Sequence, residues 1–181
     1  MKSLSQAGVF ILSTILILIL SGCSFTSRII TEYDFVRAET NLSYFYYSYP
    51  KERSAGIETF KKTIIKRVDT AGNDSYEVFD FFTLNENTYH FKEEVFIIVD
   101  SVVFNIKLES FWLDNKINRD EESVTYKPLI RINYLLDDEV IERIKVSTEV
   151  IFRYYLGPQM ITLRMNKRQL KKLQEIIRRS K

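Results

Sequence analysis

The stretch ETFKKTIIKRVDTAGNDSYEVFDFFTL, residues 58–84, decides the fold of this chain. Two runs rich in strand-forming residues, 58–69 and 75–84, flank the turn-forming residues 71–74, a spacing typical of a β-hairpin. In the second run, apolar side chains occupy both alternating sets of positions, and Asp80 lies between two aromatic pairs. That pattern predicts a strand covered on both faces.

Strand patterns continue on both sides of this hairpin. The aromatic run 44–49 is followed by Pro50, so these residues are predicted to form the C-terminal end of a strand. Asp100-Ser101 separates two apolar runs and suits a tight two-residue turn. The charged and polar stretch 114–123 is predicted to be an exposed loop. The expected strands are 41–49, 58–69, 75–84, 95–99, 102–112, 124–135, 150–155 and 160–165.

Two helices are expected in the second half of the chain. The acceptors at 137–139 precede apolar residues at helical spacing and predict a short capped helix. Asn166 and Gln169 predict a capping box at the start of a closing helix, 166–180. Its apolar stripe consists of Leu170, Leu173, Ile176 and Ile177. The chain is therefore expected to be mainly β: an antiparallel β-sandwich or half-open barrel with a short helix and a C-terminal amphipathic helix.

The N-terminus has a different character. Lys2 precedes an apolar run, 7–20, that ends in Leu20-Ser21-Gly22-Cys23. A membrane-spanning helix needs about 20 apolar residues. The shorter run, the cationic start and the small residues at the end together predict a removable signal peptide, residues 1–22, with an uncleaved membrane helix as the alternative.

Leu20-Ser21-Gly22-Cys23 resembles the lipobox of bacterial lipoproteins. The resemblance implies that Cys23 is acylated, becomes the first residue and holds the protein on membrane lipid. Ser24 in place of Asp implies transport to the outer membrane of the cell envelope, on either its surface or its periplasmic face. Residues 23–40 are then expected to be a lipidated N-terminus and polar tether, and 41–181 a single domain.

Composition excludes several classes of function. The single Cys is used by the lipobox, so no thiol remains for catalysis, disulfides or metal binding. The chain has one His, which argues against a catalytic triad or a zinc site with several His ligands. It has five Gly, which argues against a Gly-rich phosphate-binding loop. Loss of Lys2 lowers the formal net charge from +2 to +1, which gives no reason to expect nucleic acid. We expect no catalytic residues, no cofactor and no metal.

Two groups of side chains are candidate binding surfaces. Tyr47 and Tyr49 could present an aromatic surface to a sugar ring or a protein, although use in the core is the favoured interpretation. Basic residues of the closing helix could contact anionic lipid, although a solvated face is favoured. The candidate lipid contacts are Lys171, Lys172, Arg178 and Arg179.

These observations predict a membrane-anchored lipoprotein whose domain is a non-catalytic interaction or structural module of the envelope, with an unknown envelope or surface protein as partner. The alternative is a small-ligand or carbohydrate-binding β-sandwich, and an enzyme is the third possibility. An exposed aromatic patch over a filled interior would favour a protein partner, whereas a deep apolar cavity would favour a small ligand.

Overall fold

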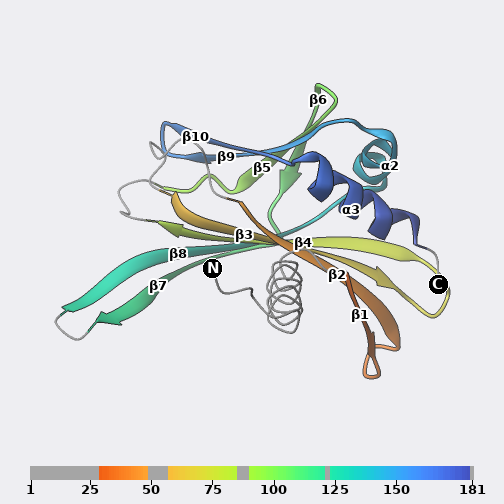
Figure 1. Ribbon diagram of the computed structural model, residues 1–181, viewed down its shortest axis with the longest axis horizontal. Coiled ribbons are helices and arrows are strands. Elements are labelled where there is room, and N and C mark those ends of the chain that lie inside the picture. The colour runs from red at the N-terminus through yellow and green to blue at the C-terminus, as the bar shows by residue number, and fades with distance from the viewer. Residues whose placement is uncertain (1–28, 49–56, 85–89, 121–122, 180–181) are drawn as a thin grey trace, which may run out of the picture.

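In the part of the chain that the structure describes, two antiparallel β-sheets pack face to face and two helices accompany them (Figure 1). The computed structural model describes residues 29–48, 57–84, 90–120 and 123–179. The six-stranded sheet has the order β1 (Ile29–Asp34), β2 (Glu39–Ser48), β3 (Ile57–Val68), β4 (Asp74–Leu84), β8 (Ser123–Leu135) and β7 (Ser110–Asp120). The four-stranded sheet has the order β10 (Gln159–Arg164), β9 (Val150–Leu156), β5 (Glu94–Val99) and β6 (Val102–Lys107). The expected mainly β fold is confirmed, and its two open sheets correspond to a sandwich.

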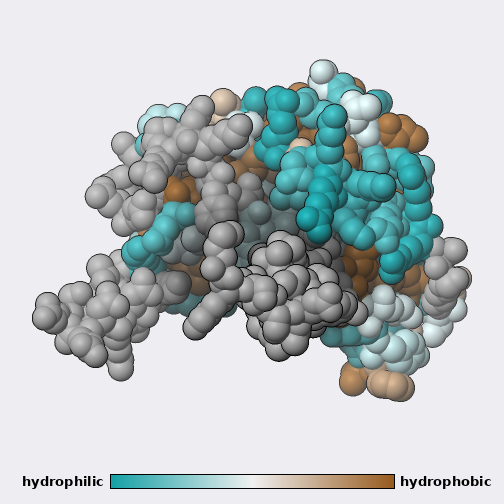
Figure 2. Space-filling model, in the orientation of Figure 1, coloured by the Kyte–Doolittle hydropathy of each residue, from teal (hydrophilic) through white to brown (hydrophobic). Residues whose placement is uncertain are grey.

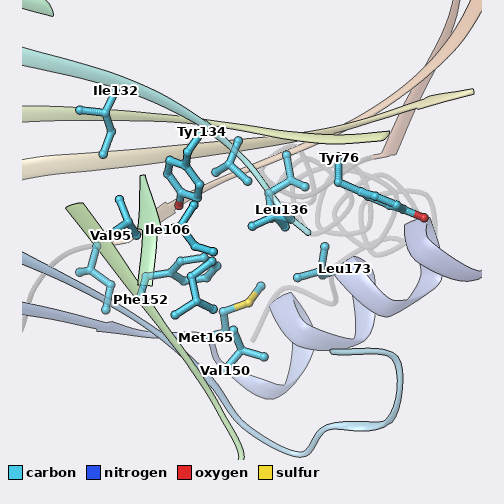
Figure 3. Packing of buried hydrophobic residues seen from close by; sticks show 14 of the residues in the cluster. Tyr76, Val95, Ile106, Ile132, Tyr134, Leu136, Val150, Phe152, Met165 and Leu173 are labelled. Atoms are coloured by element: carbon cyan, nitrogen blue, oxygen red, sulfur yellow. The ribbon is translucent and has the colours of Figure 1, made fainter. Parts of the chain in front are cut away.

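The helices extend the second layer of this sandwich. The four-stranded sheet covers part of the six-stranded sheet, and α3 (Lys167–Arg178) lies over β2 and β3 beside it (Figure 1). α2 (Asp138–Val146) packs against α3 and β5. A single apolar core fills the space between the layers, with side chains such as Tyr134, Phe152 and Leu173 meeting there (Figure 3).

The hairpin predicted at residues 58–84 is β3 and β4, with Lys62 opposite Asp80 and Ile64 opposite Val78. Gly72 has a φ of 88°, which a Gly adopts without strain. The prediction that both faces of β4 are buried holds for the inner face only. Alternate residues including Asp80 are fully buried between the layers, and the residues between them are half-buried on the outer face.

The predicted turn at Asp100-Ser101 is confirmed. Both residues have positive φ, 44° and 74°, as a two-residue turn matching the strand twist requires. The Asp100 carboxylate accepts hydrogen bonds from the Thr148 hydroxyl and from the backbone amides of Thr148 and Glu149. Desolvation acts to raise the pKa of Asp100, but these hydrogen bonds outweigh it and lower that pKa. The turn is thereby fixed to the connection between α2 and β9.

The prediction of one strand over 102–112 was wrong. The chain leaves β6 at Lys107 and enters β7 at Ser110, so the two halves belong to different sheets. The Glu109 amide donates to the Asn133 carbonyl and begins the pairing with β8. Apolar residues recur at alternate positions of the sequence on both sides of the corner, although Ile106 is buried and Trp112 is exposed, so the pattern does not reveal the change of sheet.

The prediction of a loop over 114–123 was also wrong. These residues complete β7 and begin β8, and their pairing continues to Asp120 opposite Ser123. This end of the hairpin extends beyond the second layer (Figure 1). Because backbone hydrogen bonds hold the strands together there, the side chains can be polar and still belong to a sheet.

The six-stranded sheet includes residues that precede the first predicted strand. The interval 23–40, expected to be tether, contains β1 and the start of β2, which pair from Ile29 opposite Tyr44 to Asp34 opposite Glu39. β1 is an edge strand whose side chains are mostly exposed. Its polar composition resembles a tether because neither of its faces is deeply buried.

Both predicted helices are present. The Gln169 amide donates to Asn166 Oδ1 at 2.9 Å, and the Asn166 amide donates to Gln169 Oε1 at 2.8 Å, which confirms the capping box of α3. Its predicted apolar stripe is buried. Asp137 occupies the N-cap position of α2 but makes no side-chain cap hydrogen bond. Asp138 and Glu139 in the first turn of α2 instead suit the helix dipole.

Candidate functional site

Five side chains form a row across the outer face of the six-stranded sheet, on the side away from the core. The strand register places Tyr47 beside Lys61, Lys61 beside Phe81, Phe81 beside Arg131, and Arg131 beside Trp112. We call these five residues the aromatic–cationic row. Because neighbouring strands lie about 4.8 Å apart, the row is about 19 Å long. Aromatic and cationic side chains alternate along it.

The row is open to solvent at both ends. Trp112 is 54% exposed and Tyr47 is 47% exposed. Lys61 Nζ lies 5.3 Å from the ring centroid of Phe45 and 5.7 Å from that of Phe81, so aromatic faces hold the ammonium group in place. The outer face is therefore both aromatic and positively charged along this line.

A pocket of about 410 Å³ lies at the β7 end of the row. Its size falls within the range of about 300–1,000 Å³ that is usual for small-ligand sites. Arg131 and Asp114, 3.5 Å apart at their nearest polar atoms, supply hydrogen-bond donors and acceptors beside the indole of Trp112. The pocket is lined by Phe79, Phe81, Trp112, Leu113, Asp114, Arg131 and Ile132.

The candidate aromatic surface of the sequence analysis lies partly in this row. Tyr44 and Tyr46, from the same aromatic run, are buried in the core. Tyr47 faces outward, whereas Tyr49 lies outside the described residues. Sequence reasoning missed the other four members, because each belongs to a different strand and only the register brings them together.

A second constellation is buried between the layers. Lys62 Nζ donates hydrogen bonds to Asp80 Oδ2 at 2.8 Å, to the Tyr134 hydroxyl at 2.6 Å and to the Tyr154 hydroxyl at 3.0 Å. Asp80 Oδ1 lies 2.6 Å from the same ammonium group as an ion contact without hydrogen-bond geometry. Both tyrosine hydroxyls donate to Asp80 Oδ2. The ring centroid of Phe152 lies 3.7 Å from Lys62 Nζ.

This buried cluster links the two sheets. Lys62, Asp80 and Tyr134 come from the six-stranded sheet, whereas Tyr154 and Phe152 come from the four-stranded sheet. Desolvation lowers the pKa of Lys62 to about 8, against the opposing effect of Asp80. Desolvation and the charge of Asp80 raise the pKa values of Tyr134 and Tyr154 well above their usual range.

Perturbed pKa values are common at active sites, but they also occur in structural ion-pair networks. The side chains of Lys62 and Asp80 are 0% exposed, so in this structure no substrate could touch them. The pattern of β3 gave no signal for the cluster, since Lys61-Lys62 looks like exposed charge until Asp80 is placed opposite. We assign the cluster to joining the layers.

A second buried lysine fixes α3 to the sheet. Lys66 Nζ donates to the carbonyl of Arg179 at 2.8 Å and to that of Ile177 at 3.4 Å, and it lies 2.7 Å from Asp74 Oδ2. These carbonyls end the helix, where the dipole favours a positive charge. Lys66 thus acts as a cap supplied by the opposite layer.

Most of the candidate lipid contacts on α3 are engaged within the protein. Lys172 and Arg179 pair with Glu175, and Arg178 Nη2 donates to the Lys145 carbonyl at 2.6 Å. Lys171 is exposed and lies on the solvent face of α3, which forms a hydrophilic surface (Figure 2). Two further exposed cations, Lys167 and Arg168, occupy the first turn, which lacks acidic residues.

The lipid-attachment motif, Leu20, Ser21, Gly22 and Cys23, lies outside the described residues. Within the ranges that the structure describes, no helix is long and apolar enough to cross a bilayer. The same ranges hold no group of three or more His, Cys, Asp or Glu side chains placed to bind a metal.

The chain was compared with protein-family models, with curated proteins and with solved structures, and none of them matches it.

Proposed function

We propose that this protein is a lipid-anchored module of the bacterial envelope, attached through acylated Cys23, and that it acts by binding rather than by catalysis. The proposed binding surface is the outer face of the six-stranded sheet. The aromatic–cationic row carries the proposal, because exposed Trp, Tyr and Arg side chains, which it combines, are the types enriched at binding sites. The ammonium groups of Lys62 and Lys66 between the layers, by contrast, are bound to partners within the protein.

Site-specific photo-crosslinking in intact cells tests this proposal. A photoreactive phenylalanine at Tyr47 is expected to capture a binding partner. Tyr33 on β1 supplies a matched control, since it is also a tyrosine and is 50% exposed, against 47% for Tyr47. The adduct at position 47 should disappear when Trp112→Ala is added. Equal capture at both positions would show that the outer face has no special role.

The anchor has its own test. Growth with a radioactive fatty acid is expected to label the wild-type protein and leave Cys23→Ser unlabelled, with the variant no longer partitioning with membranes. Labelling of the variant would contradict acylation at Cys23.

A second candidate function, contact with anionic lipid, is favoured by the first turn of α3. Lys167 and Arg168 lie at the helix end where the dipole disfavours cations, so helix stability does not explain them. Arg168 acts electrostatically on the Tyr44 phenol, whose partner in the sheet is Ile29. Five residues separate Ile29 from Cys23, a span of about 20 Å at most. The exposed cations of α3 therefore lie close to Ile29, the residue at which the chain enters the sheet after the proposed anchor.

Hydrogen exchange of the acylated protein in lipid nanodiscs tests this contact. Anionic lipid is expected to slow exchange in the first turn of α3 relative to neutral lipid, and Lys167→Gln with Lys171→Gln should remove the difference. Lys107→Gln, on the edge strand β6 of the four-stranded sheet, is the control. If exchange is the same in both lipids, α3 is a solvated helix only.

A further inference from the structure

We infer that the aromatic–cationic row binds an anionic glycan, a chain of sugar rings that bear carboxylate or sulfate groups. The inference rests on the proposed function and names the chemistry of its ligand. Aromatic rings and cations alternate along the row at the spacing of neighbouring strands. The strand register produces this alternation, and no single residue does.

The rings of the row fit a rod of sugar units. Tyr47, Phe81 and Trp112 lie on alternate members of the row, so neighbouring ring positions are two strand spacings, about 9.6 Å, apart. That separation is close to the length of a disaccharide. Flat aromatic faces present apolar area to the C–H faces of sugar rings, and the Tyr hydroxyl and Trp N–H add hydrogen bonds at their edges.

The cations of the row fit acidic substituents. Lys61 lies between Tyr47 and Phe81, and Arg131 lies between Phe81 and Trp112, so each positive charge falls between two ring positions. An Arg fork binds a carboxylate or sulfate through two parallel hydrogen bonds, and a Lys adds a mobile point charge. A ligand with rings alone would make no use of the positive charge of either side chain, although Arg131 also lies 3.5 Å from Asp114.

The pocket beside Trp112 adds groups that recognise hydroxyls. Asp114 and Arg131 line it together with the indole, so one sugar unit could stack on the ring while its hydroxyls meet a carboxylate and a guanidinium. This end of the row is the natural position for the terminal or best-ordered unit.

Other linear polymers fit less well. A polypeptide that binds a sheet gains its affinity from backbone hydrogen bonds at an edge, but the row crosses β3, β4 and β8, which are paired on both sides. A nucleic acid carries one phosphate per nucleotide and needs a longer cationic track than two residues provide. Acidic polypeptide and single-stranded DNA are therefore competitors in the test.

Trp112 is the only tryptophan of the whole chain, so its fluorescence reports on the row directly. The experiment uses full-length acylated protein in nanodiscs of zwitterionic lipid, which avoids sugar-based detergents. The probes are hexagalacturonate, its methyl ester, a chondroitin sulfate hexamer, poly-glutamate and oligo-thymidylate. The ester keeps the rings of the first probe and removes its charges.

At least one of the two acidic glycans is expected to change the emission of Trp112, and its affinity should fall as salt rises. For hexagalacturonate, the ester should bind about tenfold more weakly, as expected when charged hydrogen bonds are lost. Arg131→Gln and Lys61→Gln should each weaken binding by a similar factor, and Lys107→Gln should not. Calorimetry with Trp112→Phe shows whether a smaller ring weakens binding.

Three results would overturn the inference: equal binding of acid and ester, tighter binding of poly-glutamate or oligo-thymidylate, or no response to either acidic glycan. These results are separate from the proposed function. If no glycan binds but Tyr47 still captures a partner in cells, the face is an interaction surface for another ligand. If Tyr47 captures nothing, the proposed function itself fails.

Discussion

Lys62 carries an ammonium group into the centre of the core, where Asp80 and two tyrosine hydroxyls surround it. Removing one member of a buried ion pair usually costs about 3–5 kcal/mol, because the remaining charge is left without compensation. We therefore expect Asp80→Leu to lower the free energy of unfolding by roughly that amount, measured by urea denaturation. The double variant Lys62→Met with Asp80→Leu should be more stable than Asp80→Leu alone.

An exposed pair supplies the control for this experiment. Glu139 and Arg143 lie 3.5 Å apart on the surface of α2, with side chains 71% and 47% exposed. Glu139→Gln is expected to change stability by less than about 0.5 kcal/mol. If Asp80→Leu were equally mild, the buried cluster would be dispensable for joining the layers.

The same cluster predicts an unusual dependence of stability on pH. The pKa of Lys62 is lowered to about 8 in the folded state from 10.5, so above pH 8 the unfolded chain holds more protons at this group. Stability therefore rises with pH in that window, by about 2 kcal/mol between pH 8 and pH 10. Thermal or urea unfolding across this range measures the rise.

The rise should end near pH 10. Buried Tyr46, Tyr134 and Tyr154 have raised pKa values, so above pH 10 the folded state holds more protons than the unfolded state and stability falls. Lys62→Met should remove the rise and keep the fall. A wild-type stability that declines steadily from pH 8 would contradict the direction given for Lys62.

Among the elements, α3 depends on a residue from another layer. Lys66 supplies the positive charge and donors at its last carbonyls, so Lys66→Met is expected to loosen the C-terminal turn. Hydrogen bonds to charged groups contribute about 1.5–3 kcal/mol, and the loss in unfolding free energy should fall in that range. Faster hydrogen exchange should be confined to the last turn of α3. Slowed or unchanged exchange there would refute the capping role.

The helices and hairpins show how far the sequence alone leads. The capping box of α3, its apolar stripe and the turn at Asp100-Ser101 depend on residues a few positions apart, and all three were predicted. The change of sheet between β6 and β7 depends on a partner, Asn133, far along the chain, and it was missed. The polar end of β7 was missed because its strands are held by backbone hydrogen bonds rather than by apolar side chains.

In the candidate site, too, the features set by neighbouring residues were predicted and those set by distant strands were missed. Tyr47 was found because an aromatic run is visible locally, whereas Lys61, Arg131 and Trp112 join it only through the order of five strands. Alternation predicts which residues share a face of one strand but not which strands are neighbours. A binding surface built across a sheet is therefore hidden from single-sequence reasoning.

At the scale of the whole molecule, the two proposed surfaces face in opposite directions. α3 packs on the core side of β2 and β3, so this helix lies on the opposite side of the six-stranded sheet from the aromatic–cationic row (Figure 1). With α3 toward the bilayer, the aromatic–cationic row would face away from it. A membrane contact and a glycan could thus be bound together without competing for the same side of the domain.

The cluster around Lys62 also has a consequence for folding kinetics. Its partners Tyr134 and Tyr154 lie 72 and 92 residues further along the chain. Contacts at such separations form slowly because long loops must close first. We therefore expect Tyr154→Phe to speed unfolding in stopped-flow experiments and to leave the folding rate nearly unchanged, provided that it costs more than about 0.6 kcal/mol.

A folding rate that dropped in proportion to the lost stability would instead place the contact between the sheets in the transition state. Before β9 packs on the six-stranded sheet, water can still hydrate the Lys62 ammonium group. The desolvation cost of this charge therefore arises only when the second layer covers it. A second layer docked out of register would bury that charge without the Tyr154 hydroxyl, which would make the misdocked arrangement less stable than the native one. The buried lysine thus favours the native register of the two layers.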